Sequence, residues 1–181
     1  MKGNPEGLSS TPSYWPNNPN RPVESISWED TQVFFNHLND QQKGNLLSGW
    51  SYILPFEAQW EYACRAGTTT YYSWGNDIDP SKANYNWDGH YHTGNDFKQT
   101  RNVGQYAPNP WGFFDMQGNV AEWVFDWKER YPSGLQTDPE GPTSGTERTV
   151  RGGSWGDVGG GLRSAQRHLA SNLGASAKGF R

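Results

Sequence analysis

The stretch with the clearest chemistry is DMQGNVAEW, from Asp115 to Trp123. Its two carboxylates, Asp115 and Glu122, flank Gly118 and Asn119, a pair typical of a turn. Two carboxylates with backbone carbonyls between them supply the kind of oxygen ligands that a hard cation such as Ca²⁺ requires. A purely structural alternative is that Asp115 and Asn119 cap the turn while Glu122 pairs with an arginine.

Residues that could carry nucleophilic or redox chemistry are few. Cys64 is the sole cysteine, so the chain has neither a disulfide framework nor a cysteine-rich zinc site. The histidines are scattered, at His37, His90, His92 and His168. The H-x-H pair among them lies in a polar stretch, where such pairs are more often solvated than metal-bound. Residues 156–161, GDVGGG, lack the Lys-Ser/Thr ending of a phosphate loop. We therefore expect no catalytic residue.

The elements that must position these residues belong to one domain of 181 residues. Aliphatic residues are sparse, but 10 Trp, 9 Tyr and 8 Phe predict an aromatic core lined by glycine. A net charge of −4 and the lack of Lys/Arg runs argue against nucleic-acid binding. No apolar run approaches the roughly 20 residues of a membrane helix, and no signal peptide follows Met1, so the chain as given is expected to be soluble, with its compartment undetermined.

A first helix is predicted at SWEDTQVFFNHLND, residues 27–40. Ser27 can cap it, and the acidic residues of its first turn suit the positive end of the helix dipole. Val33, Phe34 and Leu38 are expected to form its apolar face.

A second helix is predicted at LPFEAQWEYACRAG, residues 54–67. Pro55 is expected to start it and Gly67 to end it. Trp60, Ala63 and Cys64 share one face, which makes Cys64 a small buried hydrophobe rather than a reactive thiol.

The rest of the chain is predicted to be loops and short strands. Residues 67–110 are too long for an ordinary loop and too aromatic for disorder, so packed Trp74, Trp87 and Trp111 or a bound cation must fix them. After them EWVFDW alternates, with Trp123, Phe125 and Trp127 on one face. RTVRGGSW and the terminal KGFR are further strand candidates, joined by glycine-rich turns.

A family resemblance rests on seven segments in order: RPVESISWEDTQVFFNHL, YILPFEAQWEYACRAGT, ANYNW, NPWGFFDMQGNVAEWVFDW, RTVRGGSW, LRSAQR and GFR. From about Arg21 to Arg181 the chain resembles the formylglycine-generating-enzyme, or sulfatase-modifying-factor, family. That resemblance implies an α+β domain with a variant of the C-type lectin fold, in which two helices pack on short antiparallel strands amid much irregular backbone. Family members usually carry a further N-terminal segment with the first strand, so a truncated N-terminus stays open.

The resemblance also implies metal sites. Asp115, Glu122 and the carbonyls of Gly118 and Val120 match the family's calcium positions, which makes calcium the expected structural cofactor. A second family site would involve Asn84, the Tyr85 carbonyl, Asn95 or Asp96, and the Phe97 carbonyl.

The catalytic activity of the enzymes for which the family is named is not expected in this chain. They are copper-dependent oxidases that use a pair of cysteines in the C-terminal segment, and this segment has none. Serine and alanine cannot replace a thiolate, which is acidic and a soft ligand. A branch that uses non-haem iron needs clustered histidines with a carboxylate, which are also lacking. We therefore expect a protein that is not an enzyme.

The C-terminal segment 151–181 alternates between ordered motifs and irregular filling. The filling, residues 156–161 and 168–177, contains no Lys, Glu, Gln, Met or Trp, the five residues that a codon ending in C or T cannot encode. Randomising the two adenines of an Asn codon gives the residue set seen here. The pattern resembles the variable region of a diversity-generating retroelement target protein, although a short Gly/Ala/Ser loop can also avoid five residues by chance.

The expected function is therefore a ligand-binding scaffold whose exposed C-terminal positions bind a protein or other macromolecule, with neither nucleic-acid binding nor membrane insertion. The predicted binding residues are Gly156, Asp157, Val158, Gly160, Gly161, His168, Leu169, Ala170, Ser171, Asn172, Leu173, Gly174, Ala175, Ser176 and Ala177. Around them, Arg163 and Arg167 should pair with carboxylates or loop carbonyls, Trp155 and Phe180 should lie in the core, and Trp15 or Tyr91 could add aromatic anchors. Two alternatives stay open: a metal-dependent oxidase or accessory domain of the same superfamily, and a regulatory module of a larger protein.

Overall fold

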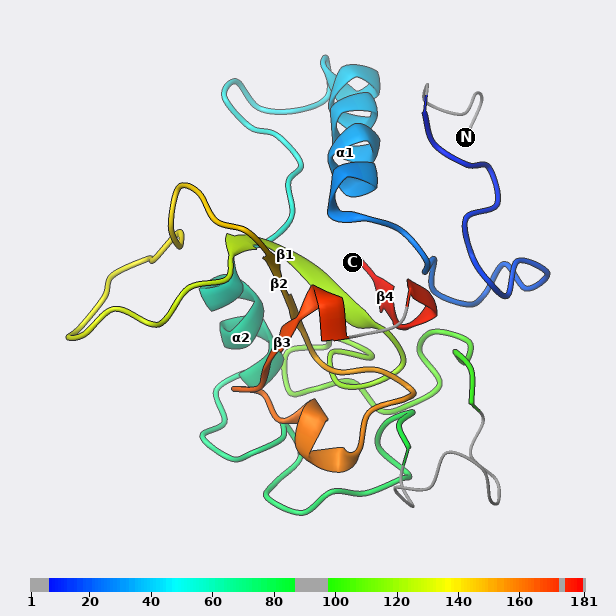
Figure 1. The fold of residues 1–181 in the computed structure, drawn as a ribbon, viewed down its shortest axis with the longest axis vertical. Helices are drawn as coiled ribbons and strands as arrows, with labels where there is room; N and C mark the ends of the chain where they lie inside the picture. The colour runs from blue at the N-terminus through cyan, green and yellow to red at the C-terminus, as the bar shows by residue number, and fades with distance from the viewer. Residues whose placement is uncertain (1–6, 87–97, 173–174, 181) are drawn as a thin grey trace.

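The computed structural model describes residues 7–86, 98–172 and 175–180. Its elements are α1 (Trp28–Gln42), α2 (Glu57–Arg65), β1 (Ala121–Trp127), β2 (Arg148–Arg151), β3 (Arg167–Leu169) and β4 (Lys178–Gly179), with 3₁₀ turns at Gly159–Leu162, Ala170–Asn172 and Ala175–Ala177. Long irregular connections join these short elements (Figure 1).

Helix α1 forms where the sequence predicts it. Ser27 accepts a hydrogen bond from the backbone N–H of Asp30, and Asp30 accepts one from the N–H of Ser27, which completes a capping box. The buried face of α1 differs from the predicted one. Phe35 is its buried aromatic residue, while Phe34 and Leu38 are only partly buried. Val33 is not part of that cluster, since it lies on the other side of Phe34 around the helix.

Helix α2 begins at Glu57, two residues after Pro55, and ends at Arg65. Ala66 adopts the left-handed conformation that closes the helix, with φ 47°, and Gly67 follows at φ 87°. The predicted face is confirmed, since Trp60 and Cys64 are buried with Ala63 packed beside them.

The four strands form one mixed sheet in the order β3-β2-β1-β4. The pairs β1–β2 and β2–β3 are antiparallel as predicted, but β4 lies parallel to β1. The expectation of antiparallel strands alone is therefore wrong for the last strand. The tail returns to the sheet through its 3₁₀ turns, not through a hairpin, which lets it run in the same direction as β1.

The alternation of β1 places one helix against each of its faces. Ala121, Trp123 and Phe125 belong to the cluster that contains α1, whereas Val124 packs with Trp60 of α2. The predicted face continues only to Phe125. A register shift against β2 follows, and Trp127 instead packs on the guanidinium of Arg148, 3.5 Å from its ring.

The long segment after α2 is fixed chiefly by polar side chains. Trp74 packs against a third buried cluster as predicted, but Trp111 is 46% exposed and contacts Tyr62. Trp87 lies outside the described residues. Buried amides hold the backbone: Asn109 donates to the carbonyl oxygens of Ala63 and Cys64, and Gln117 donates to that of Leu162.

Candidate functional site

The C-terminal segment is anchored by a buried arginine at the end of β2. Arg151 has no exposed surface. It forms an ion pair with Glu61 of α2 and lies 3.4 Å from Glu57. Its guanidinium also donates to the carbonyl oxygens of Ser164 and Gln166, each at 2.7 Å. One side chain thus joins the sheet, α2 and the connection that precedes β3.

The two arginines predicted to support the segment do so. Arg167 makes a bidentate pair with Glu57, with both N–O distances at 2.6 Å, and also donates to the Glu129 carbonyl. Arg163 donates to the Gly160 carbonyl at 3.1 Å and to Gln166. Both predictions are confirmed, and α2 supplies the partner of Arg167.

The aromatic residues at the two ends of the segment are only half-buried. Phe180 packs edge-on against Phe34 and Phe35 of α1, with ring centroids 5.1 and 5.6 Å apart. Trp155 donates its indole N–H to the Ser176 carbonyl and contacts the ring of Trp15. Tyr91, the other suggested anchor, lies outside the described residues.

The predicted binding residues fall into three groups by exposure. Exposed positions are Val158, Gly160, Ser171 and Ala175. Partly exposed positions are Gly156, Asp157, Gly161, His168, Leu169 and Ser176. Ala170 and Ala177 are buried, which corrects the expectation that the whole filling is exposed. Leu173 and Gly174 lie outside the described residues, and Asn172 is placed only in its backbone.

Some positions of the filling also make hydrogen bonds within the domain. Asp157 accepts from the backbone N–H and the hydroxyl of Ser154, at 2.9 and 2.7 Å. His168 lies 2.8 Å from the Gly161 carbonyl. A Cβ at Gly159 would meet Ile78 at 2.7 Å, whereas a Cβ at Gly160 would meet nothing. Turn closure and close packing therefore restrict part of the filling and leave a smaller set free.

The residues of the expected calcium site each have protein partners. Asp115 accepts from the backbone N–H of Gly104 at 2.6 Å, and the buried Glu122 accepts from the indole N–H of Trp60 at 2.8 Å. Gly118 approaches Asn84 so closely that a Cβ would lie 2.6 Å from its carbonyl oxygen, and Val120 is buried. Over the described ranges, no group of three or more His, Cys, Asp and Glu residues is placed to hold a metal.

Of the second expected metal site, only part is described. Asn84 is buried and donates to the Gln99 carbonyl and the side-chain oxygen of Asn119. Tyr85 is also buried, in the third cluster. Asn95, Asp96 and Phe97 lie outside the described residues.

The cysteine is poorly suited to thiolate chemistry. Cys64 has no exposed surface, and its thiol donates to the Ser164 hydroxyl at 3.7 Å. Burial raises the pKa of the thiol to about 12, although the bond to Ser164 opposes this change. The thiolate is therefore scarce at neutral pH.

Taken together, a curled mixed sheet with a helix against each face and long bonded loops defines a C-type lectin-like α+β domain. The chain belongs to the sulfatase-modifying factor enzyme 1-like domain family, whose model matches residues 2–181.

Three similar proteins illustrate the range of this family. The chain is 34% identical to the formylglycine-generating enzyme of Bos taurus over 159 residues, which covers 83% of the chain and 38% of the enzyme. It is 40% identical to the serine/threonine-protein kinase pkn1 of Chlamydia pneumoniae over 135 residues, covering 71% of the chain and 20% of the kinase. The chain thus spans well under half the length of these curated relatives.

The third protein is a solved structure, Treponema denticola variable protein 1. It superposes with a TM-score of 0.75 at 27% identity, covering 99% of this chain and 77% of that one. In the described part of our structure, no helix has both the length and the apolar character needed to span a membrane.

Proposed function

We propose that the domain is a non-enzymatic scaffold that binds a protein or other macromolecular ligand through a diversified C-terminal surface. The observation that carries this proposal is the division within residues 151–180. Arg151, Leu162 and Ser164, which stand outside the filling, are buried. The exposed side chains of the filling, those of Val158, Ser171 and Ala175, all belong to the codon set that adenine mutagenesis can reach.

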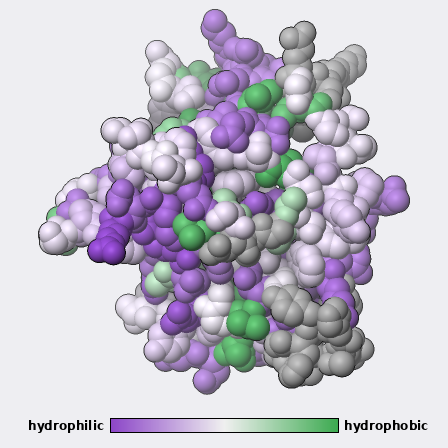
Figure 2. Space-filling view, viewed as in Figure 1, coloured by the Kyte–Doolittle hydropathy of each residue, from purple (hydrophilic) through white to green (hydrophobic). Residues whose placement is uncertain are grey.

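The separation of buried frame residues from exposed filling residues suits a display function, by which we mean the presentation of variable side chains to a ligand. Exposed loop side chains can change at little cost in stability when the backbone is fixed elsewhere. Here the sheet and the arginine network, formed by Arg151, Arg163 and Arg167 with their partners, fix the backbone. The face that carries β3 and the 3₁₀ turns is mostly polar to neutral, with apolar side chains in small separate groups (Figure 2). The present variant, with small and modestly polar residues, is suited to weak binding that other side chains would strengthen.

The gene locus tests the proposal most directly. We expect a nearby template repeat with adenines at the codons for 156–161 and 168–177, and a reverse transcriptase gene beside it. A locus that has neither would refute the diversified-surface proposal.

The alternative function is a metal-dependent oxidase or accessory domain, as the relatives named formylglycine-generating enzyme suggest. The buried, hydrogen-bonded Cys64 weighs against the thiol-based form of this alternative. Elemental analysis of the purified protein separates the two. Copper or iron at stoichiometric occupancy with redox activity would support an oxidase, and its lack would support the scaffold.

A second alternative is a regulatory module of a larger protein, for which the match to one fifth of a bacterial kinase is the supporting observation. The full-length gene decides this point, because it shows which other domains accompany this one.

Calcium at Asp115, Glu122, Gly118 and Val120 remains our proposal for a structural cofactor. An ion that binds only the folded state adds RT ln(1 + [L]/Kd) to stability, so added calcium should raise the melting temperature and a chelator should lower it. Asp115→Ala and Glu122→Ala should each abolish the response. A melting temperature that calcium and chelator leave unchanged in the parent protein would exclude the site.

A further inference from the structure

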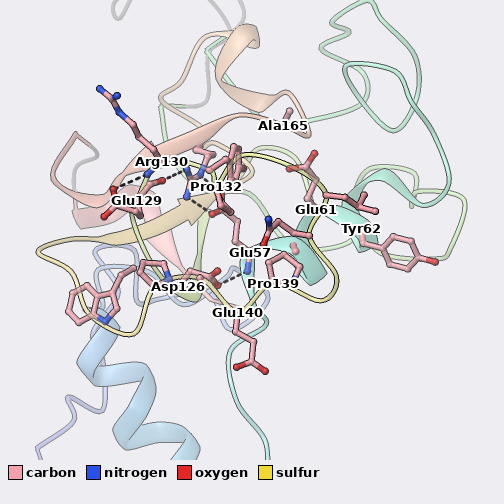
Figure 3. A pocket seen from close by; sticks show the side chains of 18 of the residues that line it. Glu57, Glu61, Tyr62, Asp126, Glu129, Arg130, Pro132, Pro139, Glu140 and Ala165 are labelled. Atoms are coloured by element: carbon pink, nitrogen blue, oxygen red, sulfur yellow. Dashed lines mark hydrogen bonds and ion pairs between the residues drawn. The ribbon is translucent and has the colours of Figure 1, made fainter.

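A cavity of about 850 Å³ lies between α2, the end of β1 and the connection from β1 to β2, and Arg167 also lines it. Residues of the connection between β1 and β2 line it on one side and residues along α2 on another (Figure 3). Glu57, Glu61 and Asp126 line it together with Tyr131 and Pro139. Its volume falls within the usual range for pockets that take small molecules.

Most of the charges on the α2 side already have partners. Glu57 is paired with Arg167, and Glu61 with Arg65 and Arg151. The Arg167 guanidinium lies 4.1 Å from the ring centroid of Tyr131, which fixes that ring at the pocket wall. These groups shape the cavity, but their charges largely cancel.

Asp126 differs from them because no cation of the described residues forms an ion pair with it. Its side chain is 5% exposed, and one oxygen, Oδ2, accepts from the backbone N–H of Glu57 at 2.7 Å. The backbone N–H of Asp126 itself also hydrogen-bonds the carboxylate. The chain passes close by at Gly141, where a Cβ would lie 2.6 Å from Oδ1, so only glycine fits there. A buried carboxylate that lines a cavity without a counterion favours a cationic guest.

The walls indicate what the cation must be attached to. Pro132, Pro139, Pro142 and Leu135 supply apolar surface, and the lining as a whole carries five carboxylates against three guanidinium groups. An anion would meet a net negative lining, and a bare metal ion would leave the apolar walls unused. We propose that this pocket binds a small organic cation, a protonated amine on an apolar body, whose ammonium group pairs with Asp126.

The pH dependence of binding follows from the same carboxylate. Burial, and after it the nearby Glu57, raises the pKa of Asp126 to about 6, while its hydrogen bond from the Glu57 N–H and the charge of Arg167 oppose the change. Tyr131, Glu129 and Glu140 of the covering segment and Glu61 of α2 also face this space, and no histidine lines it. An alkylamine stays protonated throughout this range, so its affinity should fall as the pH drops below 6.

The same pKa sets a stability prediction. A carboxyl group whose folded pKa exceeds its unfolded pKa, here about 6 against 3.8, binds more protons in the folded state between those values. The contribution of the Asp126 carboxyl to the free energy of unfolding is therefore fully present at low pH. It is lost as the pH rises from 3.8 through 6. Asp126→Asn should raise the melting temperature at pH 7.5 more than at pH 4, measured by thermal denaturation at both pH values. A melting temperature of Asp126→Asn below that of the parent protein at pH 7.5 would contradict the burial of this carboxylate.

Calorimetric titration of the whole chain tests the pocket with three matched probes: phenethylamine, 2-phenylethanol and 3-phenylpropanoate. At pH 7.5 we expect phenethylamine to bind at least about tenfold more tightly than the neutral and anionic probes, since a charge-assisted contact is lost in both. Asp126→Asn should reduce its affinity about tenfold, because the amide keeps the bond from Glu57 but not the charge. Asp138→Asn, in the same covering segment but outside the lining, should leave it unchanged.

A second variant guards against an indirect effect of the charge change. Ala58→Leu adds volume at the pocket wall on an α2 position and removes no polar group, so it should weaken phenethylamine binding while the helix persists by circular dichroism. Equal affinity of the three probes, tighter binding of 3-phenylpropanoate, or unchanged amine affinity in both folded variants would each overturn the proposal. The variants leave residues 156–177 unchanged. A lack of amine binding would therefore not count against the proposed ligand binding by those residues.

Discussion

Changing the four exposed positions of the filling together should leave the domain as stable as before. In the variant Val158→Thr, Gly160→Ser, Ser171→Asn and Ala175→Thr, each replacement stays within the codon set. None of these positions is buried, and a Cβ at Gly160 meets nothing within 4 Å. We expect each change to alter the free energy of unfolding by about 0.5 kcal/mol or less, measured by urea denaturation.

Phe180→Ala should cost about 2 kcal/mol by the same measurement, less than a fully buried ring, since its half-buried ring packs against Phe34 and Phe35. Both variants change the same C-terminal segment, so a difference in their stability reflects side-chain packing and not the place of the changes in the chain. A quadruple variant as destabilised as Phe180→Ala would mean that the filling is core, and the display proposal would fail.

Asp157 offers a matched control inside the filling. Asp157→Asn keeps an oxygen that can accept from the Ser154 N–H and hydroxyl, so its cost should be small. Asp157→Ala removes that acceptor and should cost about 1 kcal/mol, the usual net value of such a bond. Diversification at this position is thus expected to be tolerated unevenly.

Local patterns predicted the elements that depend on neighbours in sequence. The capping box of α1 involves Ser27 and Asp30, three residues apart, and the face of α2 follows from helical spacing. The parallel pairing of β4 was not predictable in this way. It involves only Lys178 and Gly179 against Ala121 and Glu122, and a Cβ at Gly179 would overlap the Val23 carbonyl oxygen. Such a strand is defined by tertiary contacts and carries no periodic signal of its own.

The site shows the same limit. Sequence reasoning indicated that Arg167 pairs with carboxylates or loop carbonyls, but Glu57 lies 110 residues earlier and could not be chosen from spacing. It also missed Asp126 altogether, because this residue reads simply as the polar side of an alternating strand. The one available signal was its place among the residues of β1 that face α2, next to Glu122 and Val124, where a second carboxylate is unusual.

The largest single loss of stability is expected from Arg151→Met. The side chain has no exposed surface and binds Glu61, the carbonyls of Ser164 and Gln166, and the face of Trp60 at 5.1 Å. Methionine has comparable length but no charge, so it removes one of the two arginines paired with Glu61, the cation 3.4 Å from the buried Glu57, and the donors to two carbonyl oxygens. Breaking a buried pair from one side costs about 3–5 kcal/mol.

The measurement is urea denaturation of Arg151→Met beside Arg163→Met, an exposed arginine of the same segment that donates to the Gly160 carbonyl. The control should lose no more than about 1 kcal/mol. In the double variant Arg151→Met/Glu61→Gln, little of the loss should be recovered, because Glu61 still pairs with Arg65 in Arg151→Met and the carbonyl bonds remain broken in both variants. If Arg151→Met cost as little as Arg163→Met, the network would not anchor the segment, and the fixed frame on which the display proposal depends would have to lie in the sheet and the aromatic contacts alone.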